Sequence, residues 1–397
     1  MREKQKPLPK SDTLEASSPA GGRNDGVDAC RIAAMFMIVL LHVLNFGGLL
    51  YSAPMLSPRY NAMWFLEAMA YCAANTYALI SGYVGYGSRF RYANLLYLCA
   101  QVLFYTLLIT AGFFIFRPAV VGKRVVLEAL FPFAFPSFYW YFTAYFCMFF
   151  FLPLLNLILD RVDTFPGGVR GLAASALLVF SLLPTLTGTD SGGTAGGYTP
   201  LWLAVLYLAG GCLKKYRAAE RYPQWINIAL FCAGALVNMA VKLTGERLAI
   251  QRGGYVEPGF FLLRYPSPTI LLCAVCLLNF FSRLQVTGFW KKFVRFFAPA
   301  TFGVYLIHCE PLIRAHGNYP ALSGLLVLPP PVLVPAVLGV AAGIWLACSL
   351  LDRLRLALFQ FLGVREKCVR LEERLRARLS GLNKESSFTQ LSNIKRK

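Results

Sequence analysis

Charged side chains and histidines are scarce in this chain. Of its 397 residues, 15% are Asp, Glu, Lys or Arg, 57% are hydrophobic, and three are histidines. Water-soluble domains carry more charge than this, so the composition excludes an ordinary soluble fold. The apolar segments also lack the strict alternation of polar and apolar residues that is typical of outer-membrane barrel strands. The sequence therefore predicts an all-α, polytopic helical membrane protein.

Acidic residues are also few, 19 against 39 basic ones, which gives a net charge of +20. In a soluble protein this excess would indicate a nucleic-acid partner. We expect none here, because the basic residues gather in alternate loops and in the C-terminal segment. Between about ten predicted spans, 29 of them fall in the inner segments and nine in the outer ones. This bias is typical of a multi-pass protein of the cell (plasma or inner) membrane and predicts that both termini are cytoplasmic.

The predicted spans divide the chain into three parts. Residues 1–24 form a polar cytoplasmic leader, residues 25–352 a transmembrane domain, and residues 353–397 a basic amphipathic tail that we expect on the inner leaflet. No soluble catalytic domain and no inverted repeat is apparent. The ten spans are expected at about residues 28–50, 62–86, 92–116, 137–158, 169–188, 198–214, 224–244, 264–283, 296–313 and 332–352.

The eleven cysteines do not form a recognisable framework. Nine lie in apolar runs, and the pair Cys273 and Cys276 has no other candidate ligand close by in the sequence. Cysteines in such runs usually pack as small apolar side chains. We therefore expect neither disulfide bonds nor a bound metal.

The first span contains three polar residues that are costly in lipid. Asp28 and Arg31 are one helical turn apart, and His42 follows Arg31 by eleven residues, so all three lie on roughly one helix face. His42 is then about 16 Å deeper along the helix than Arg31. A local ion pair with Arg31 reaching the headgroups, together with a packed histidine, is the structural alternative. Three such residues on one face favour a functional stripe that meets a partner or a wet cavity.

Five stretches along the chain form a recognisable set. In order, they are the Arg–His spacing in Val27–His42, LISGY at Leu79–Tyr83, the aromatic run Tyr139–Asn156 (YWYFTAYFCMFFFLPLLN), Tyr198–Tyr216 (YTPLWLAVLYLAGGCLKKY) and FGVYLIHCEP at Phe302–Pro311. Together they resemble the acyltransferase-3 family of integral membrane acyltransferases over about residues 24–352. The resemblance implies transfer of an acyl group, usually acetyl, from cytoplasmic acyl-CoA to a hydroxyl of a glycan or similar acceptor at the cell envelope.

Acyl transfer from a thioester to a hydroxyl requires a base, a hydrogen-bond donor to the oxyanion and residues that bind CoA. His42 is the candidate base, Asp28 can orient Arg31, and Arg31 can hold the phosphates or the pantetheine arm. The resemblance adds Arg89 and Arg91 as a CoA-binding pair. Their spacing departs from the RxxR-like pair of the family, and residues two apart do not share a helix face.

Four further residues are candidates at the outer side of the membrane. His308 is a second acid or base candidate, with an interfacial histidine that caps a helix as the alternative. Tyr305, one turn earlier, can donate to an oxyanion. Glu310 and Glu67 are candidate ligands for acceptor hydroxyls, although Glu67 also fits a position at the membrane interface.

Two other functions remain open from the sequence. A transporter or flippase can use the same charged stripe as a proton relay, and a membrane scaffold can recruit partners through its basic tail. An acyltransferase would take acyl-CoA as donor substrate, with membrane lipids around it and no metal.

Overall fold

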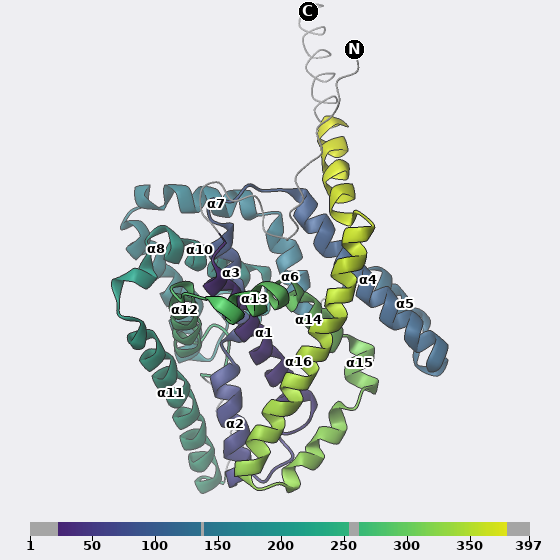
Figure 1. The fold of residues 1–397 in the computed structure, drawn as a ribbon. Helices are drawn as coiled ribbons and strands as arrows, with labels where there is room; N and C mark the ends of the chain where they lie inside the picture. Colours follow the sequence, from purple (N-terminus) through teal and green to yellow (C-terminus); the bar gives the residue numbers. More distant parts are fainter. Residues whose placement is uncertain (1–22, 136–138, 254–261, 379–397) are drawn as a thin grey trace, which may run out of the picture.

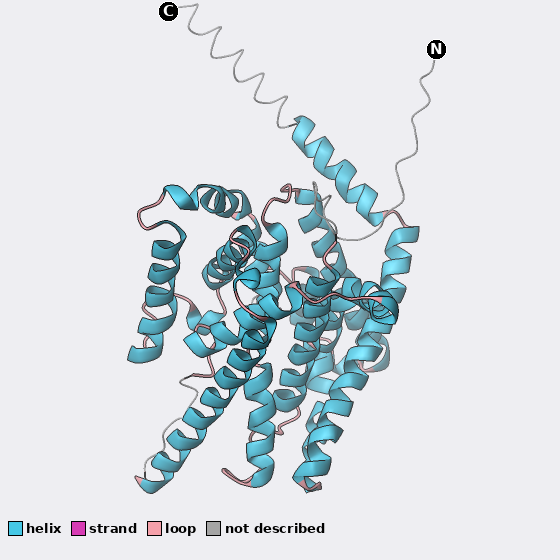
Figure 2. Ribbon diagram, turned by 60° about the vertical axis from the view of Figure 1, so that its left-hand side comes forward, coloured by secondary structure: helices cyan, strands magenta, loops and turns pink. Residues whose placement is uncertain are grey.

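A computed structural model describes residues 23–135, 139–253 and 262–378, and all regular elements in these ranges are helical (Figure 1). Figure 2 shows helices joined by loops, with no strand in the described part of the chain. The predicted all-α class is therefore confirmed. The first 22 residues of the predicted leader, and residues 379–397 of the predicted tail, lie outside the described residues.

Several of these helices can cross a membrane, as the composition predicted. Five qualify by length and apolar character, and a bent pair, Trp140–Phe149 with Leu152–Thr164, adds a sixth candidate. The two halves of that pair meet at 66°. The full set of ten spans stays a prediction. The five helices are α1 (Asp25–Phe46), α4 (Tyr92–Phe116), the continuous run Gly168–Thr187, α11 (Gln224–Gln251) and α16 (Pro330–Phe361).

The other helices are shorter, and two further predicted spans are interrupted besides 137–158, which contains the bend of that pair. The predicted span 62–86 breaks at residues 71–72, and the predicted span 296–313 contains a turn of 3-10 helix at Ala298–Ala300. The shorter helices are α2 (Pro58–Ala70), α3 (Ala73–Gly85), α5 (Lys123–Leu130), α6 (Trp140–Phe149), α7 (Leu152–Arg161), α10 (Pro200–Lys215), α12 (Pro268–Ser282), α13 (Gly288–Phe297), α14 (Thr301–His308) and α15 (Pro311–His316). The run Gly168–Thr187 is itself composed of α8 (Gly168–Leu177), a π-helical turn and α9 (Leu183–Thr187).

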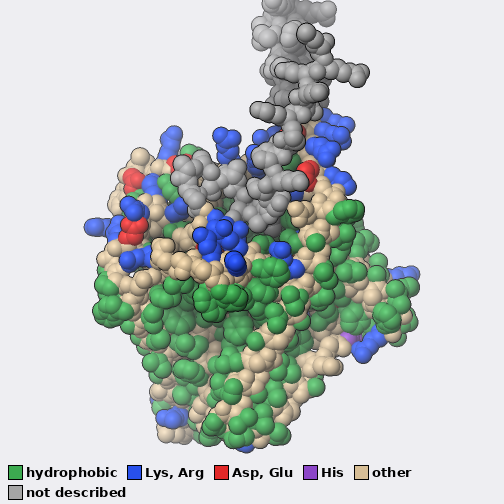
Figure 3. All heavy atoms as spheres, in the orientation of Figure 1, with side chains coloured by type: hydrophobic (Ala, Val, Ile, Leu, Met, Phe, Trp, Pro, Cys, Tyr) green, Lys and Arg blue, Asp and Glu red, His purple; other side chains and the backbone are tan. Residues whose placement is uncertain are grey.

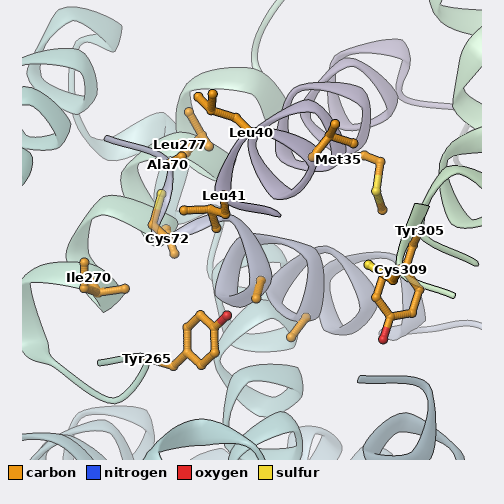
Figure 4. Close-up of a cluster of buried hydrophobic side chains, with 14 of the residues drawn as sticks. Met35, Leu40, Leu41, Ala70, Cys72, Tyr265, Ile270, Leu277, Tyr305 and Cys309 are labelled. Carbon is orange, nitrogen blue, oxygen red and sulfur yellow. The ribbon is translucent and has the colours of Figure 1, made fainter. Parts of the chain in front are cut away.

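Helix α1 lies at the centre of the molecule, where it packs against α2, α3, α12, α14 and α16 (Figure 1). Asn24 begins the helix, and its side chain accepts hydrogen bonds from two backbone N–H groups of the first turn. Figure 4 shows Met35 and Leu41 of α1 in the buried cluster that also contains Leu277 and Tyr305. Because α1 packs against these helices, its buried Asp28 side chain faces other parts of the protein.

Helices α3 and α10 approach each other so closely that glycine is required at the contact. A Cβ atom on Gly82 would lie 1.9 Å from the carbonyl oxygen of Tyr207, and one on Gly210 would lie 2.0 Å from that of Leu79. No side chain fits at either position. This contact fixes α3, which carries Tyr77 one turn and a half before Gly82.

Charged and apolar side chains are segregated on the face drawn in Figure 3. Apolar side chains cover its middle, and Lys and Arg gather at the end where α7 and the C-terminal end of α16 lie. After Gly363, which has φ +59°, residues 364–378 continue as a helix. Glu372 of this segment accepts hydrogen bonds from the backbone N–H groups of Tyr92 and Ala93, at 3.1 and 3.2 Å. The tail segment is thereby attached to the first turn of α4.

Candidate functional site

Asp28 of α1 holds two arginines. Its carboxylate accepts from Arg31 Nη1 at 2.7 Å and from Arg23 Nε at 2.7 Å, and the Asp28 side chain is buried. An ionised carboxylate that bridges two guanidinium groups restricts both of them. The role that the sequence suggested for Asp28, orienting Arg31, matches this geometry, and Arg23 is an addition that the sequence did not point to.

Both arginines line a pocket of about 270 Å³, which we call the arginine pocket. Arg89 and Arg91 line it as well. Their segment precedes α4 and is not helical, and Arg91 has an extended backbone with φ −140° and ψ 124°. In extended chain, residues two apart point to the same side. The objection that Arg89 and Arg91 would not share a helix face therefore does not apply to them, and it was wrong to count it against the pair. The pocket is also lined by Tyr77, Ser81, Ser88, Phe90, Asn94, Tyr141, Phe142, Tyr145, Asn156, Tyr207, Thr301 and Phe302, among others.

His42 lines a second, much smaller pocket of about 30 Å³, the histidine pocket. Three side chains, Tyr77, Tyr141 and Phe302, line both pockets. The two pockets are therefore back to back on one side of α1, with Arg31 at the first and His42 at the second. Eleven residues of helix separate these side chains by about 16 Å. The remaining lining of the histidine pocket is Met35, Ile38, Leu41, Ala74, Trp140, Tyr265 and Tyr305.

His308 of α14 contacts His42 directly. His42 Nδ1 lies 2.9 Å from His308 Nε2, and His308 Nδ1 lies 2.5 Å from the carbonyl oxygen of Val304. A carbonyl oxygen can only accept, so His308 carries its hydrogen on Nδ1. With both rings neutral, His308 Nε2 then accepts from His42 Nδ1–H, and the lone pair of His42 is on Nε2. The geometry thus selects the tautomer in which Nε2 can take a proton.

The ring of His42 is also held from the side. It stacks on Phe46, one turn later in α1, with ring centroids 4.8 Å apart and an angle of 3° between the planes. His308 is 1% exposed and does not line the histidine pocket, whereas His42 does. His308 therefore contacts His42 on the side away from the pocket, which fits a role in orienting His42, and its role as a second acid or base stays a prediction.

Cys309 is a neighbour of both rings that the sequence did not single out. Its Sγ lies 3.2 Å from His42 Nδ1 and 3.4 Å from His308 Nε2. The adjacent residues His308 and Cys309 are visible in the sequence, but their contact with His42 joins positions 266 and 267 residues apart. Two imidazole nitrogens and a thiol sulfur therefore converge at one point beside α1.

The outer candidates have different surroundings. Tyr305 lines the histidine pocket with His42. Glu310 caps α15, because its Oε2 accepts from the N–H groups of Leu312 and Ile313 at 2.7 and 3.0 Å. Its Oε1 has no hydrogen-bond partner among the described residues.

Glu67 is 6% exposed, so it does not lie on an open interfacial surface, and neither it nor Glu310 lines either pocket. The structure thus brings Tyr305 to His42 but not these two carboxylates.

Comparison with known protein families matches residues 24–350 to an acyltransferase domain, that of the acyltransferase-3 family. No curated protein matches the chain. No solved structure matches it either. The matched range contains every residue that lines the two pockets except Arg23. Because the match covers most of the chain and several helices can span a membrane, this protein is a member of the acyltransferase-3 family of membrane acyltransferases.

Proposed function

We propose that this protein is an O-acyltransferase that moves an acyl group, most simply acetyl, from cytoplasmic acyl-CoA to a hydroxyl of an extracytoplasmic or lipid-linked glycan. The observation that carries the proposal is the pair of pockets back to back on α1. An arginine-lined pocket suits a polyanionic nucleotide, and a narrow pocket at a histidine suits a small reacting group. Both pockets share a lining of Tyr77, Tyr141 and Phe302. The nucleotide end and the acyl end of one acyl-CoA molecule would be connected past these side chains.

The arginine pocket has the charge that CoA requires. Four arginines line it and Asp28 neutralises part of that charge, so a net positive charge remains for phosphate oxygens. Arg89 and Arg91 are exposed, which opens the pocket to the surface on their side. The nucleotide can therefore lie partly outside while the thin pantetheine arm enters. Phe90 and Tyr145 offer aromatic faces within the same lining.

The histidine pocket limits the size of the acyl group. Its volume of about 30 Å³ is enough for a group of a few heavy atoms and not for a long chain. This favours acetyl over a fatty acyl group. It also keeps the thioester carbonyl close to the His42 ring, as a positioned base requires.

In the proposed reaction, His42 Nε2 takes the proton of the acceptor hydroxyl while its oxygen attacks the thioester carbonyl carbon. The negative charge moves to the carbonyl oxygen, and the Tyr305 hydroxyl is the candidate donor to it. The C–S bond then breaks, and the CoA sulfur leaves with the proton that His42 holds. The products are the acyl ester and CoA thiol, and His42 returns to its starting tautomer.

The proposed topology has ten spans with both termini and the arginine pocket on the cytoplasmic side. The basic end of the face drawn in Figure 3 supports this orientation, since Lys and Arg favour the inner surface. CoA would then be bound from the compartment in which it is made. The acceptor would approach His42 from the other side of the shared lining.

Purified protein in lipid nanodiscs with acetyl-labelled acetyl-CoA tests the proposal. We expect release of CoA thiol and transfer of label to a glycolipid or glycan fraction extracted from the source membranes. A transporter or flippase would consume no acetyl-CoA. The absence of any acetyl-CoA turnover, with acceptor fractions present and protein shown to be folded, would remove the proposed function in favour of transport.

A further inference from the structure

The reactive histidine and two side chains beside it form a set of metal ligands. We propose that His42, His308 and Cys309 bind a thiophilic divalent cation, Zn²⁺, and that the bound ion switches off His42 as a base. The binding site stands on its own geometry. Its effect on acyl transfer rests on the proposed function.

The spacing of the ligand atoms fits a zinc ion. His42 Nδ1, His308 Nε2 and Cys309 Sγ all lie within 4.8 Å of one another, with separations of 2.9, 3.2 and 3.4 Å. In a tetrahedral site with Zn–N of about 2.0–2.1 Å and Zn–S of about 2.3 Å, nitrogen pairs lie about 3.3 Å apart and N···S pairs about 3.6 Å. The two ligand atoms of each pair therefore need to move apart by less than about 0.5 Å to bind the ion.

The hydrogen bond behind His308 is a second observation that points to a ligand. Histidines that bind metals usually donate their other ring N–H to a carbonyl or carboxylate, which fixes the ring and directs the lone pair at the ion. His308 Nδ1 donates in this way to the carbonyl oxygen of Val304, so that Nε2 is free of hydrogen and faces the cluster. The stacking of Phe46 on His42 fixes the other ring.

The ligand set also selects the kind of ion. Two imidazoles and a thiol are suited to Zn²⁺ and similar thiophilic ions, whereas Mg²⁺ and Ca²⁺ prefer oxygen ligands. No carboxylate belongs to the cluster among the described residues. His308 is 1% and Cys309 8% exposed, so the protein ligands would displace most of the water around the ion. A water molecule would complete the fourth position.

Metal binding changes which nitrogen of His42 carries hydrogen. Without the ion, Nδ1–H donates to His308 and Nε2 carries the lone pair that accepts the substrate proton. With the ion, Nδ1 donates its lone pair to Zn²⁺, and the ring hydrogen moves to Nε2 through solvent. The thiol proton of Cys309 is released to solvent as thiolate binds. His42 Nε2 then holds a hydrogen and has no lone pair for the acceptor hydroxyl.

Binding is tested with tag-free protein, Zn²⁺ and Co²⁺. We expect about one zinc ion to remain per chain after gel filtration, and a thiolate-to-metal charge-transfer band with Co²⁺. Cys309→Ala should lose both signals. Cys276→Ala, which removes another buried cysteine from α12 outside the cluster, is the matched control and should keep both. Equal zinc retention in Cys309→Ala and the unaltered protein would overturn the proposed site.

The switch is tested by transfer assays with stoichiometric Zn²⁺ and with chelator. We expect the unaltered protein and Cys276→Ala to lose transfer at least about tenfold with zinc and to recover with chelator, as blocking a positioned base requires. Cys309→Ala, measured against its own metal-free rate, should lose its sensitivity to zinc. Bound zinc that leaves the rate unchanged, or equal inhibition of Cys309→Ala, would overturn the switch. A protein without transferase activity would still be tested by the binding signals, so the two failures are distinguishable.

Discussion

Substitutions of His308 test whether this residue orients the base, His42, or acts as a base itself. In the structure His42 Nδ1 lies 2.9 Å from His308 Nε2, and this contact selects the tautomer of His42 that accepts a proton on Nε2. His308→Leu removes the accepting Nε2 atom and puts an apolar side chain of similar size in its place. His42 can then adopt either tautomer, and a fraction of the molecules will present N–H to the substrate.

The magnitude follows from the value of one hydrogen bond. A neutral hydrogen bond contributes about 0.5–1.5 kcal/mol net. At about 1.4 kcal/mol per factor of ten, His308→Leu should lower kcat about 2- to 12-fold. His42→Gln removes the proton acceptor and should lower kcat about 10²- to 10⁴-fold. His308→Gln should stay within about twofold of the unaltered rate, because its amide oxygen can accept from His42 Nδ1–H.

The assay is steady-state transfer from labelled acetyl-CoA, with chelator present and acetyl-CoA affinity measured separately. His316→Gln is the matched control, because the third histidine is exposed at the end of α15, and it should leave the rate unchanged. If kcat falls in His308→Leu and is equally low in His308→Gln, the orienting role is contradicted. If His42→Gln keeps more than about a tenth of the rate, His42 is not the base.

Three further predictions concern packing, donor binding and topology. Gly82→Ala should destabilise the protein by about 1–3 kcal/mol because α3 and α10 must separate, and thermal unfolding measures it; Gly112→Ala, with open space around its Cβ, should not. Equal melting temperatures for the two variants would contradict the close contact. Arg31→Ala should weaken acetyl-CoA binding about 10- to 100-fold, and Arg31→Lys should restore it in part, because ammonium lacks the planar fork. Unchanged affinity in calorimetry would make Arg31 a structural residue. Single cysteines at Gly193 and at Lys215, in a cysteine-free variant, should react with impermeant reagent from opposite sides of the membrane; labelling from one side would contradict the ten-span topology.

The arrangement within α1 could be predicted from the sequence because it depends on local geometry. The apolar run predicted a span at 28–50, and the helix observed is Asp25–Phe46. Helical periodicity alone put Arg31 and His42 on one face. The contact of His42 with His308 could not be predicted in this way, since it joins residues 266 positions apart through the packing of α14 on α1.

Interruptions within apolar runs were the other feature that the sequence did not reveal. The predicted span 62–86 is the two helices α2 and α3, and the break falls at Tyr71 and Cys72, where neither Gly nor Pro marks it. In a buried position the apolar pattern continues through a turn, because both faces remain in contact with protein. Arg89 and Arg91 are a similar case, since a helical interpretation of their spacing does not hold for extended chain.

The carboxylate of Glu372 has a consequence for any experiment that shortens the chain. It occupies the first two amide groups of α4, directly after the segment that carries Arg89 and Arg91. Deletion from residue 364 onward would remove this contact together with the basic tail, so a loss of activity would not separate partner recruitment from an unravelled helix start. Glu372 caps the two amides with two different oxygens, so it must be kept: neutralising the tail arginines other than Arg376, its own ion-pair partner, leaves the helix start capped and tests recruitment alone.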